Sequence, residues 1–211
     1  MKEGGPSDPQ WLRWTKRLQA IAQDGLTYSN DDYDLGRYEQ LRGLAAEMLA
    51  AHSTGTLEEA RDLLVLETGP ATPKVDVRAA VFENDRILLV KEPDEPGWAV
   101  PGGWADVGES PSEAAARETL EESGYSVRPV RLLAVYDRER HGHPPMAYHV
   151  YKLVYLCELL AEERLTDVDA DGARFFGEQE IPDLSVTRIT RAQISRFFAQ
   201  HRDPSIPTDF D

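Results

Sequence analysis

The chain has 211 residues, of which 41% are apolar and 29% charged, and its formal net charge is -15. This length suits one ordinary domain with a small appended unit, and the balance of apolar and charged residues excludes wholesale disorder. The acidic balance argues against general nucleic-acid binding and against binding to membrane surfaces, because such partners need a basic footprint. It suits a protein that holds cations.

The sequence predicts neither a disulfide framework nor a targeting segment. The single cysteine, Cys157, lies in an apolar run, which favours a buried, inert thiol over a nucleophile or a zinc ligand. The first residues lack the apolar core of a signal peptide, and no apolar run reaches the roughly 18 residues of a membrane span. We therefore expect a cytoplasmic protein without a membrane partner.

A helix is predicted near the start of the chain. Asp8 and Pro9 are typical of a helix start, and Gly25 is expected to end the helix. Between them, an apolar stripe recurs at helical spacing: Trp11, Trp14, Leu18 and Ile21. This stripe is large for so short a helix, and packing on neighbouring helices or on a partner subunit explains it equally well.

Two more helices complete a predicted N-terminal helical domain over residues 1–70. One helix spans residues 33–52, and the other begins at Thr56 with the spacing of a capping box. Two prolines and a glycine in residues 68–74 then predict a linker. The remainder, residues 71–211, forms the second predicted domain.

Strands dominate this second domain. Residues 75–82 and 86–91 are short β-rich runs separated by three polar residues, which predicts a hairpin. Further along the chain, we expect three strands and a closing helix: residues 130–137, 147–156 and 174–176 for the strands, and 187–201 for the helix. Strands around one central helix, followed by a final helix, predict a layered α+β domain.

The acidic segment at residues 102–125 predicts a helix with one carboxylate face. Ser110, Pro111 and Glu113 form a helix start, and Gly124 is a natural end. At about 100° per residue, one arc of this helix holds three glutamates: Glu118, Glu121 and Glu122. Like charges at these spacings repel, and a hard divalent cation, Mg²⁺ or Mn²⁺, removes that penalty.

This segment resembles the signature of the Nudix hydrolases, which cleave nucleoside diphosphates linked to another moiety. Seven glycine or polar positions match: Gly103, Glu109, Arg117, Glu118, Glu121, Glu122 and Gly124. Thr119 departs from the aliphatic residue that the family usually has, which bears on packing rather than chemistry. The resemblance implies a Nudix-type α/β/α sandwich with a mixed sheet.

The resemblance also implies roles for these positions. Glu109 and Arg117 would form a buried pair that orients the helix and its loop. The implied metal ligands are the Gly102 carbonyl and the carboxylates of Glu118, Glu121 and Glu122. A metal bridging the diphosphate can neutralise developing charge and lower the pKa of an attacking water, which implies substitution at phosphorus. Glu121, Glu122 and a loop acid elsewhere are candidates for the general base.

The flanking residues extend the resemblance to nearly the whole chain. Residues 11–41 and 75–82 resemble a bacterial Nudix branch that carries an N-terminal helical domain and includes CDP-choline pyrophosphatase. This branch implies hydrolysis of CDP-choline to CMP and phosphocholine by a homodimer to which the N-terminal helices contribute. ADP-ribose or another sugar nucleotide is the alternative substrate.

Candidate substrate contacts lie outside the motif. Arg78 resembles a phosphate-contacting position of this branch. Arg138, His141 and His143 offer positive charge in one loop, as a counterpart to the metal face, and an ordinary surface loop explains them equally well. Trp98 is a candidate for stacking on a base or a choline cation, although core packing is the stronger interpretation.

Taken alone, residues 167–178 suggest a function of another class, a non-catalytic calcium-binding or dimerisation module. The EF-hand loop pattern is matched by five residues: Asp167, Asp169, Asp171, Gly172 and Glu178. However, Arg174 stands where an aliphatic residue is expected, and Pro182 disfavours an exiting helix. We therefore expect an acidic loop that leads into a strand.

Overall fold

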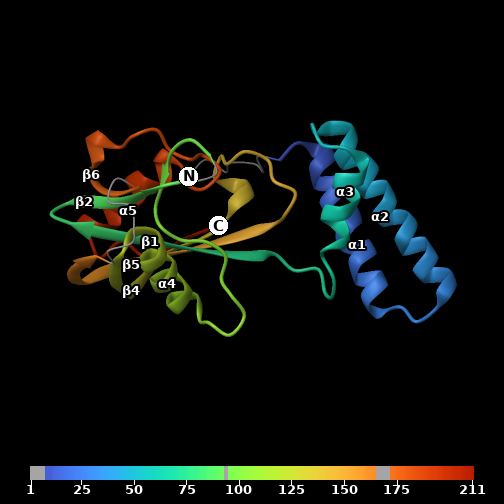
Figure 1. The fold of residues 1–211 in the computed structure, drawn as a ribbon, viewed down its shortest axis with the longest axis horizontal. Helices are drawn as coiled ribbons and strands as arrows, with labels where there is room; N and C mark the ends of the chain where they lie inside the picture. The colour runs from blue at the N-terminus through green and yellow to red at the C-terminus, as the bar shows by residue number, and fades with distance from the viewer. Residues whose placement is uncertain (1–7, 93–94, 165–171) are drawn as a thin grey trace. The chain divides into compact units, whose positions relative to one another are not determined.

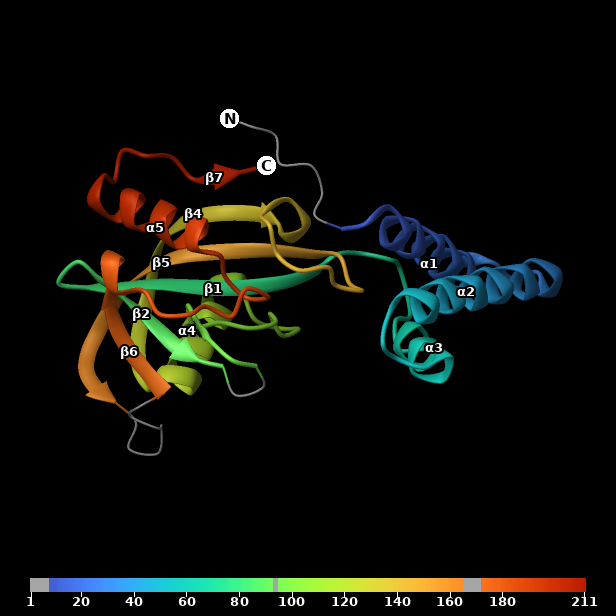
Figure 2. The ribbon, with the colours of Figure 1, turned by 90° about the horizontal axis from the view of Figure 1, so that it is seen from above.

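The computed structural model describes residues 8–92, 95–164 and 172–211, with only the backbone at 161–164 (Figures 1 and 2). The chain forms two compact units. The first comprises residues 8–73 and 145–149, and the second comprises residues 74–144 and 150–211. Among the described residues, no helix has both the length and the apolar character needed to cross a membrane.

Three helices build the first unit: α1 (Gln10–Tyr28), α2 (Asp32–His52) and α3 (Leu57–Val65) (Figure 1). Its core contains Leu12, Ala45, Ala46, Leu49, Ala60 and Leu64. The predicted capping box of α3 is confirmed, because Thr56 Oγ1 accepts the Glu59 N–H while the Glu59 carboxylate accepts the Thr56 N–H. The first helix begins at Gln10, and Asp8 forms an ion pair with Lys16 at 2.6 Å.

Gly25 is a contact between helices, and the prediction that it ends the first helix is wrong. The helix continues to Tyr28. A Cβ at position 25 would lie 2.3 Å from the Tyr38 ring on α2. Gly25 therefore permits the close approach of the two helices, and its backbone does not adopt the positive φ that would end α1.

The apolar stripe of α1 divides into two rows. Trp11 and Leu18 pack on the core of the helical unit, and Trp11 stacks on His52. Trp14 and Ile21 are 51% and 53% exposed, and Tyr28, another seven residues along, is 67% exposed. Because seven residues are close to two helical turns, these three side chains share one face of α1. We call Trp14, Ile21 and Tyr28 the exposed row.

Within the described residues, the second unit contains a mixed sheet in the order β3-β2-β1-β5-β4-β7, with β6 paired to β2. The strands are β1 (Lys74–Glu83), β2 (Arg86–Lys91), β3 (Trp98–Ala99), β4 (Tyr125–Asp137), β5 (Val150–Arg164), β6 (Ala173–Gly177) and β7 (Asp209–Phe210). The predicted hairpin is confirmed, since β1 and β2 are antiparallel and Asn84 and Asp85 turn the chain at positive φ.

Two helices cover opposite faces of this sheet, α4 (Pro111–Ser123) and α5 (Arg191–Arg202) (Figure 2). Ala114 and Ala115 of α4 pack on Val77, whereas Phe197 and Phe198 of α5 belong to the cluster that contains Ala80. Val77 and Ala80 point to opposite faces because side chains alternate along a strand. The predicted α/β/α sandwich with a mixed sheet is confirmed.

The strand limits differ from the sequence prediction. Strand β4 begins at Tyr125, five residues before the predicted start, and its pairing with β5 shifts register at three places, one of them between Pro129 and Arg131. These irregularities break the alternation of apolar and polar residues from which a strand is predicted. Strand β7 was not predicted, because its two residues form a strand only through pairing with Ala134 and Val135.

The prediction of a buried thiol is confirmed. Cys157 on β5 belongs to the cluster that contains Ala79, Val81 and Val127. Burial raises the pKa of the Cys157 thiol to about 12. The reactive thiolate is therefore scarce at neutral pH, in keeping with a structural role.

Gly25→Ala is expected to lower the free energy of unfolding of the helical unit by about 1–3 kcal/mol, because the added Cβ must displace the Tyr38 ring. Gly43→Ala in α2 is the matched control, since a Cβ there meets no atom within 4 Å. The control is expected to stabilise by roughly 1 kcal/mol. Urea denaturation followed by circular dichroism measures both, and equal effects would contradict the contact role of Gly25.

Candidate active site

Local signals set both ends of α4, which carries the glutamate cluster. Ser110 Oγ accepts the Glu113 N–H, and the Glu113 carboxylate accepts the Ser110 N–H at 2.8 Å. Gly124 adopts φ 74° and donates its N–H to Leu120 O. The predicted helix and the capping role of Glu113 are both confirmed. The register of the glutamates on α4 is therefore fixed by residues within the segment itself.

Small residues form the buried side of α4: Ala114, Ala115, Thr119 and Ser123. Thr119 Oγ1 donates to Ala115 O at 2.7 Å, and Ser123 Oγ donates to Thr119 O at 2.5 Å. Both hydroxyls are thus satisfied within the helix, so that Thr119 fills an otherwise aliphatic position without leaving an unpaired buried group. This narrow side lets α4 lie close to β1.

Arg117 connects α4 to the loop that precedes it. Its Nε and Nη2 donate to the two Glu109 oxygens at 2.7 and 3.0 Å, and its Nη1 lies 3.0 Å from both Glu118 and Glu121. The bond from Arg117 lowers the pKa of Glu109, and the same bond raises the pKa of Arg117. The pair is present, but at 27% and 25% exposure its side chains are only partly buried.

Glu122 lies against the glycine turn. Its Oε2 accepts the Gly102 N–H at 2.8 Å. Burial raises the pKa of Glu122 to about 7, although the Gly102 N–H and Arg78 both oppose this rise. The turn needs glycine, because Gly102 adopts φ 140° and a Cβ there would lie 2.0 Å from Val77 O. The motif therefore brings a buried carboxylate into contact with backbone.

The donors around this turn fit a hard divalent cation. In the part of the chain that the structure describes, no three acidic, histidine or cysteine side chains already form a metal cage. Arg117 instead pairs with Glu118 and Glu121. The Glu118 carboxylate nevertheless lies close to Gly103, where an added Cβ would meet it at 2.9 Å. Oxygen ligands of this kind suit Mg²⁺ or Mn²⁺, and a cation would offset the buried charge of Glu122.

A buried ion network lies beside the turn. Arg78 Nε and Nη2 donate to Asp76 at 2.7 and 3.2 Å, and Lys152 Nζ donates to Asp76 at 2.8 Å. Burial opposes the ionisation of Asp76, but Arg78 and Lys152 outweigh it and lower the pKa to about 2. Burial lowers the pKa of Lys152 to about 8 despite Asp76. Arg78 Nη1 also donates to Val100 O at 3.2 Å, so that Arg78 supports the strand leading into the turn.

Comparison with known proteins agrees with this geometry. A model described as the NUDIX domain matches residues 72–197. The chain belongs to the Nudix family. A second model, described as "UDP-X-like, N-terminal oligomerisation domain", matches residues 9–64. A Bacillus subtilis (strain 168) protein named "Putative ADP-ribose pyrophosphatase YjhB" is 45% identical over 202 residues, which cover 96% of this chain and 97% of that protein.

Two solved structures support the same assignment. One is a UDP-X diphosphatase, 35% identical, with a TM-score of 0.60 over 95% of this chain and 98% of the other. The second is an ADP-ribose pyrophosphatase from Streptococcus suis 89-1591, 35% identical, with a TM-score of 0.59 over 66% of this chain and 100% of the other. This protein is therefore a Nudix pyrophosphohydrolase that acts on nucleoside diphosphate derivatives.

The interpretation of Arg138 and His143 as open surface-loop residues is wrong. Both are buried. Arg138 donates to Pro144 O at 2.8 Å and to Thr187 O at 3.3 Å, and His143 Nδ1 lies 2.8 Å from Val186 O. Burial lowers the pKa of His143 to about 4, so that the ring is neutral at physiological pH. These side chains hold the loop in place.

The other two candidate substrate residues occupy different surroundings. His141 Nε2 lies 3.0 Å from an Asp211 oxygen near the chain end. Trp98 packs edge-on against Phe176 at 5.1 Å between ring centroids, which agrees with the core interpretation. The substrate-binding roles expected for Trp98, Arg138, His141 and His143 stay predictions, and these contacts describe only their immediate surroundings. The sequence did not single out Asp76 and Lys152, which join Arg78 in the buried ion network.

The described residues of the segment that matches the EF-hand pattern include a strand. Asp167, Asp169 and Asp171 lie outside the described residues, whereas Arg174 is on β6 and pairs with Leu89 of β2. The predicted strand at 174–176 is confirmed.

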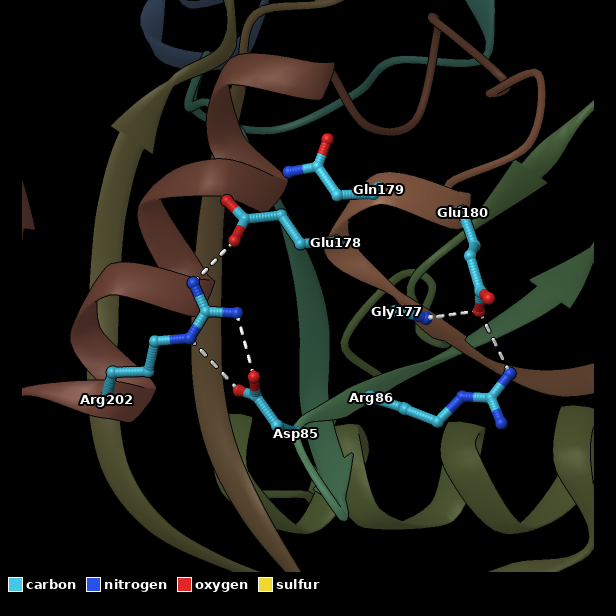
Figure 3. A pocket seen from close by; sticks show the side chains of 7 residues that line it. All are labelled: Asp85, Arg86, Gly177, Glu178, Gln179, Glu180 and Arg202. Atoms are coloured by element: carbon cyan, nitrogen blue, oxygen red, sulfur yellow. Dashed lines mark hydrogen bonds and ion pairs between the residues drawn. The ribbon is translucent and has the colours of Figure 1, made fainter.

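Glu178 lines a surface hollow with Asp85, Arg86, Gly177, Gln179, Glu180 and Arg202 (Figure 3). There Arg202 pairs with Asp85 and Glu178, and Arg86 pairs with Glu180. Glu178 therefore has a cationic partner within the protein.

The buried neutral His143 predicts an acid-sensitive contribution to stability. Because burial lowers its pKa from 6.5 to about 4, the unfolded chain takes up the proton first as the pH falls. The free energy of unfolding should therefore decrease between about pH 6.5 and pH 4, by at most about 3 kcal/mol from this group. His143→Asn keeps a donor for Val186 O and removes the titrating ring. Urea denaturation across this range should give a shallower pH slope for the variant, and identical slopes would contradict the prediction.

Proposed function

We propose that this Nudix pyrophosphohydrolase hydrolyses the diphosphate linkage of ADP-ribose with Mg²⁺ or Mn²⁺. The observation that carries this proposal is the 45% identity, over 96% of the chain, to a protein named for ADP-ribose. A UDP-linked sugar nucleotide is the second candidate, because the N-terminal family description and one similar structure both name UDP-X. None of the relatives described above is named for CDP-choline. CDP-choline therefore serves as the comparison substrate in the experiment below.

The site supports this reaction through the carboxylates that α4 carries. Glu118, Glu121 and Glu122 would supply the metal ligands, together with the Gly102 carbonyl. A bound divalent cation would neutralise charge on the diphosphate and lower the pKa of an attacking water. Glu109 would remain on Arg117 and keep α4 in position when Glu118 and Glu121 turn towards the cation. The Gly102 N–H donates to Glu122 Oε2 and orients this carboxylate.

A substrate panel tests the first part of the proposal. ADP-ribose, a UDP-sugar and CDP-choline are each incubated with Mg²⁺ or Mn²⁺, and the products are identified by chromatography. ADP-ribose is expected to give the highest kcat/KM, with AMP and ribose 5-phosphate as products of cleavage within the diphosphate. A clear preference for CDP-choline would contradict the proposed substrate and restore the expectation from the sequence.

Glu121→Gln and Glu122→Gln are each expected to lower metal-dependent kcat by about 100-fold or more, because each removes a negatively charged ligand. Glu113→Gln is the matched control on the same helix, since Glu113 is exposed and only caps the helix. It should retain turnover close to that of the unsubstituted protein. Unchanged kcat in both ligand variants would remove the proposed site.

We further propose that residues 1–70 serve oligomerisation and residues 71–211 catalysis, and that the protein is a homodimer. The exposed row of α1 supports this proposal, since isolated domains rarely leave several large apolar side chains uncovered on one face. The description of the matching N-terminal family as an oligomerisation domain supports it as well.

Ile21→Lys is expected to halve the molar mass measured by light scattering, because it places a charge in the middle of the exposed row. Leu66→Lys is the matched control, since Leu66 is 76% exposed and follows α3 rather than lying on the row. The control should keep the native mass. If Ile21→Lys also keeps it, the exposed row is not the interface.

A further inference from the structure

Glu92 is a buried carboxylate with no role in the site described above. It directly follows β2, and its N–H donates to Gly97 O at 3.1 Å, where the chain turns towards β3. The pairing of Val90 with Ala99 places this end of β2 beside the strand that leads into the Gly102 turn. Only 3% of the Glu92 side chain is exposed. A charge so well buried needs compensating partners.

The two oxygens of this carboxylate differ in the partners they have. Oε2 lies 3.4 Å from Arg188 Nη2. Oε1 accepts no hydrogen bond within the described structure, and its nearest cation is Arg78 Nη1 at 4.0 Å. Arg78 cannot move closer without loss, because Asp76 holds its Nε and Nη2 while its Nη1 donates to Val100 O. A carboxylate oxygen left without a hydrogen-bond donor in the protein interior is costly.

Glu92 also shares its surroundings with a proposed metal ligand. The carboxylates of Glu92 and Glu122 both act electrostatically on the buried Arg78 guanidinium. Arg78 already forms a bidentate pair with Asp76, so that it cannot fully compensate two further acids. Glu122 in turn contacts the Gly102 turn at 2.8 Å. Two incompletely compensated carboxylates, one from β2 and one from α4, thus flank the same guanidinium.

We propose that Glu92 Oε1 supplies a further oxygen ligand to the divalent cation bound by Glu122, either directly or through a metal-bound water. The inference rests on the proposed metal-dependent function. A cation would give Oε1 a closer positive partner than Arg78 at 4.0 Å, and Mg²⁺ and Mn²⁺ accept water-mediated carboxylates readily. The end of β2 then forms part of a site that the Nudix motif alone does not include.

The test measures Mn²⁺ binding without substrate, by electron paramagnetic resonance of the free ion. Glu92→Gln keeps the side-chain shape and removes the charge, and it is expected to raise the Kd for Mn²⁺ about tenfold. Glu92→Asp keeps the charge but withdraws the oxygens, and it should weaken binding as well. Glu95→Gln is the matched control in the same turn, since the Ser185 and Thr187 hydroxyls already bind Glu95. Its Kd should stay within about twofold of the unsubstituted value.

The outcomes separate this inference from the proposed function. If Glu122→Gln weakens Mn²⁺ binding and both Glu92 variants bind normally, the role of Glu92 is overturned and the metal site stands. If Arg188→Gln weakens Mn²⁺ binding as much as Glu92→Gln does, Glu92 acts by holding Arg188 in place rather than by binding the cation. The inference is then also overturned. If the unsubstituted protein binds no Mn²⁺, the proposed function itself fails. Near-UV circular dichroism of each variant establishes that it is folded.

Discussion

The bidentate contact between Arg117 and Glu109 is the interaction on which the active site depends. It joins the loop after the glycine turn to the middle of α4 through bonds of 2.7 and 3.0 Å. The same guanidinium reaches Glu118 and Glu121. Arg117 therefore fixes the backbone and also balances carboxylates that would otherwise repel one another. Because arginine does not lose its proton in proteins, this balance does not change with physiological pH.

Close packing is the second constraint, and it explains why the acids gather beside β1. Gly102 brings the turn against Val77 O, where no Cβ fits, and the small buried side of α4 lets the helix lie against the same strand. Glu122 is consequently buried and accepts the Gly102 N–H. Arg78 on β1 donates to Val100 O and so supports the residues that lead into the turn. This geometry concentrates negative charge at the site, and that negative charge is the physical reason for assigning a cation there.

Features encoded over a short stretch of sequence could be predicted, and those that depend on strand register could not. The cap at Ser110, the end at Gly124 and the arc of three glutamates all lie within one segment, so that local rules suffice. The Asp76–Lys152 pair requires the parallel register of β1 and β5, and Glu92 requires the turn into β3. The burial of Arg138 and His143 depends on acceptors 49 and 43 residues away along the chain. The contact role of Gly25 could not be predicted from the sequence, because its neighbour Tyr38 belongs to another helix.

A crystal structure of the protein grown with Mn²⁺, with the metal located by its anomalous scattering, is the decisive test of the metal site on α4. We expect a peak bounded by the carboxylates of Glu118, Glu121 and Glu122 next to Gly102. We also expect Arg117 to stay on Glu109 while Glu118 and Glu121 turn away from it. The absence of a peak there would rule out this metal site, and an Arg117 that leaves Glu109 when the metal binds would rule out the positioning role of this pair.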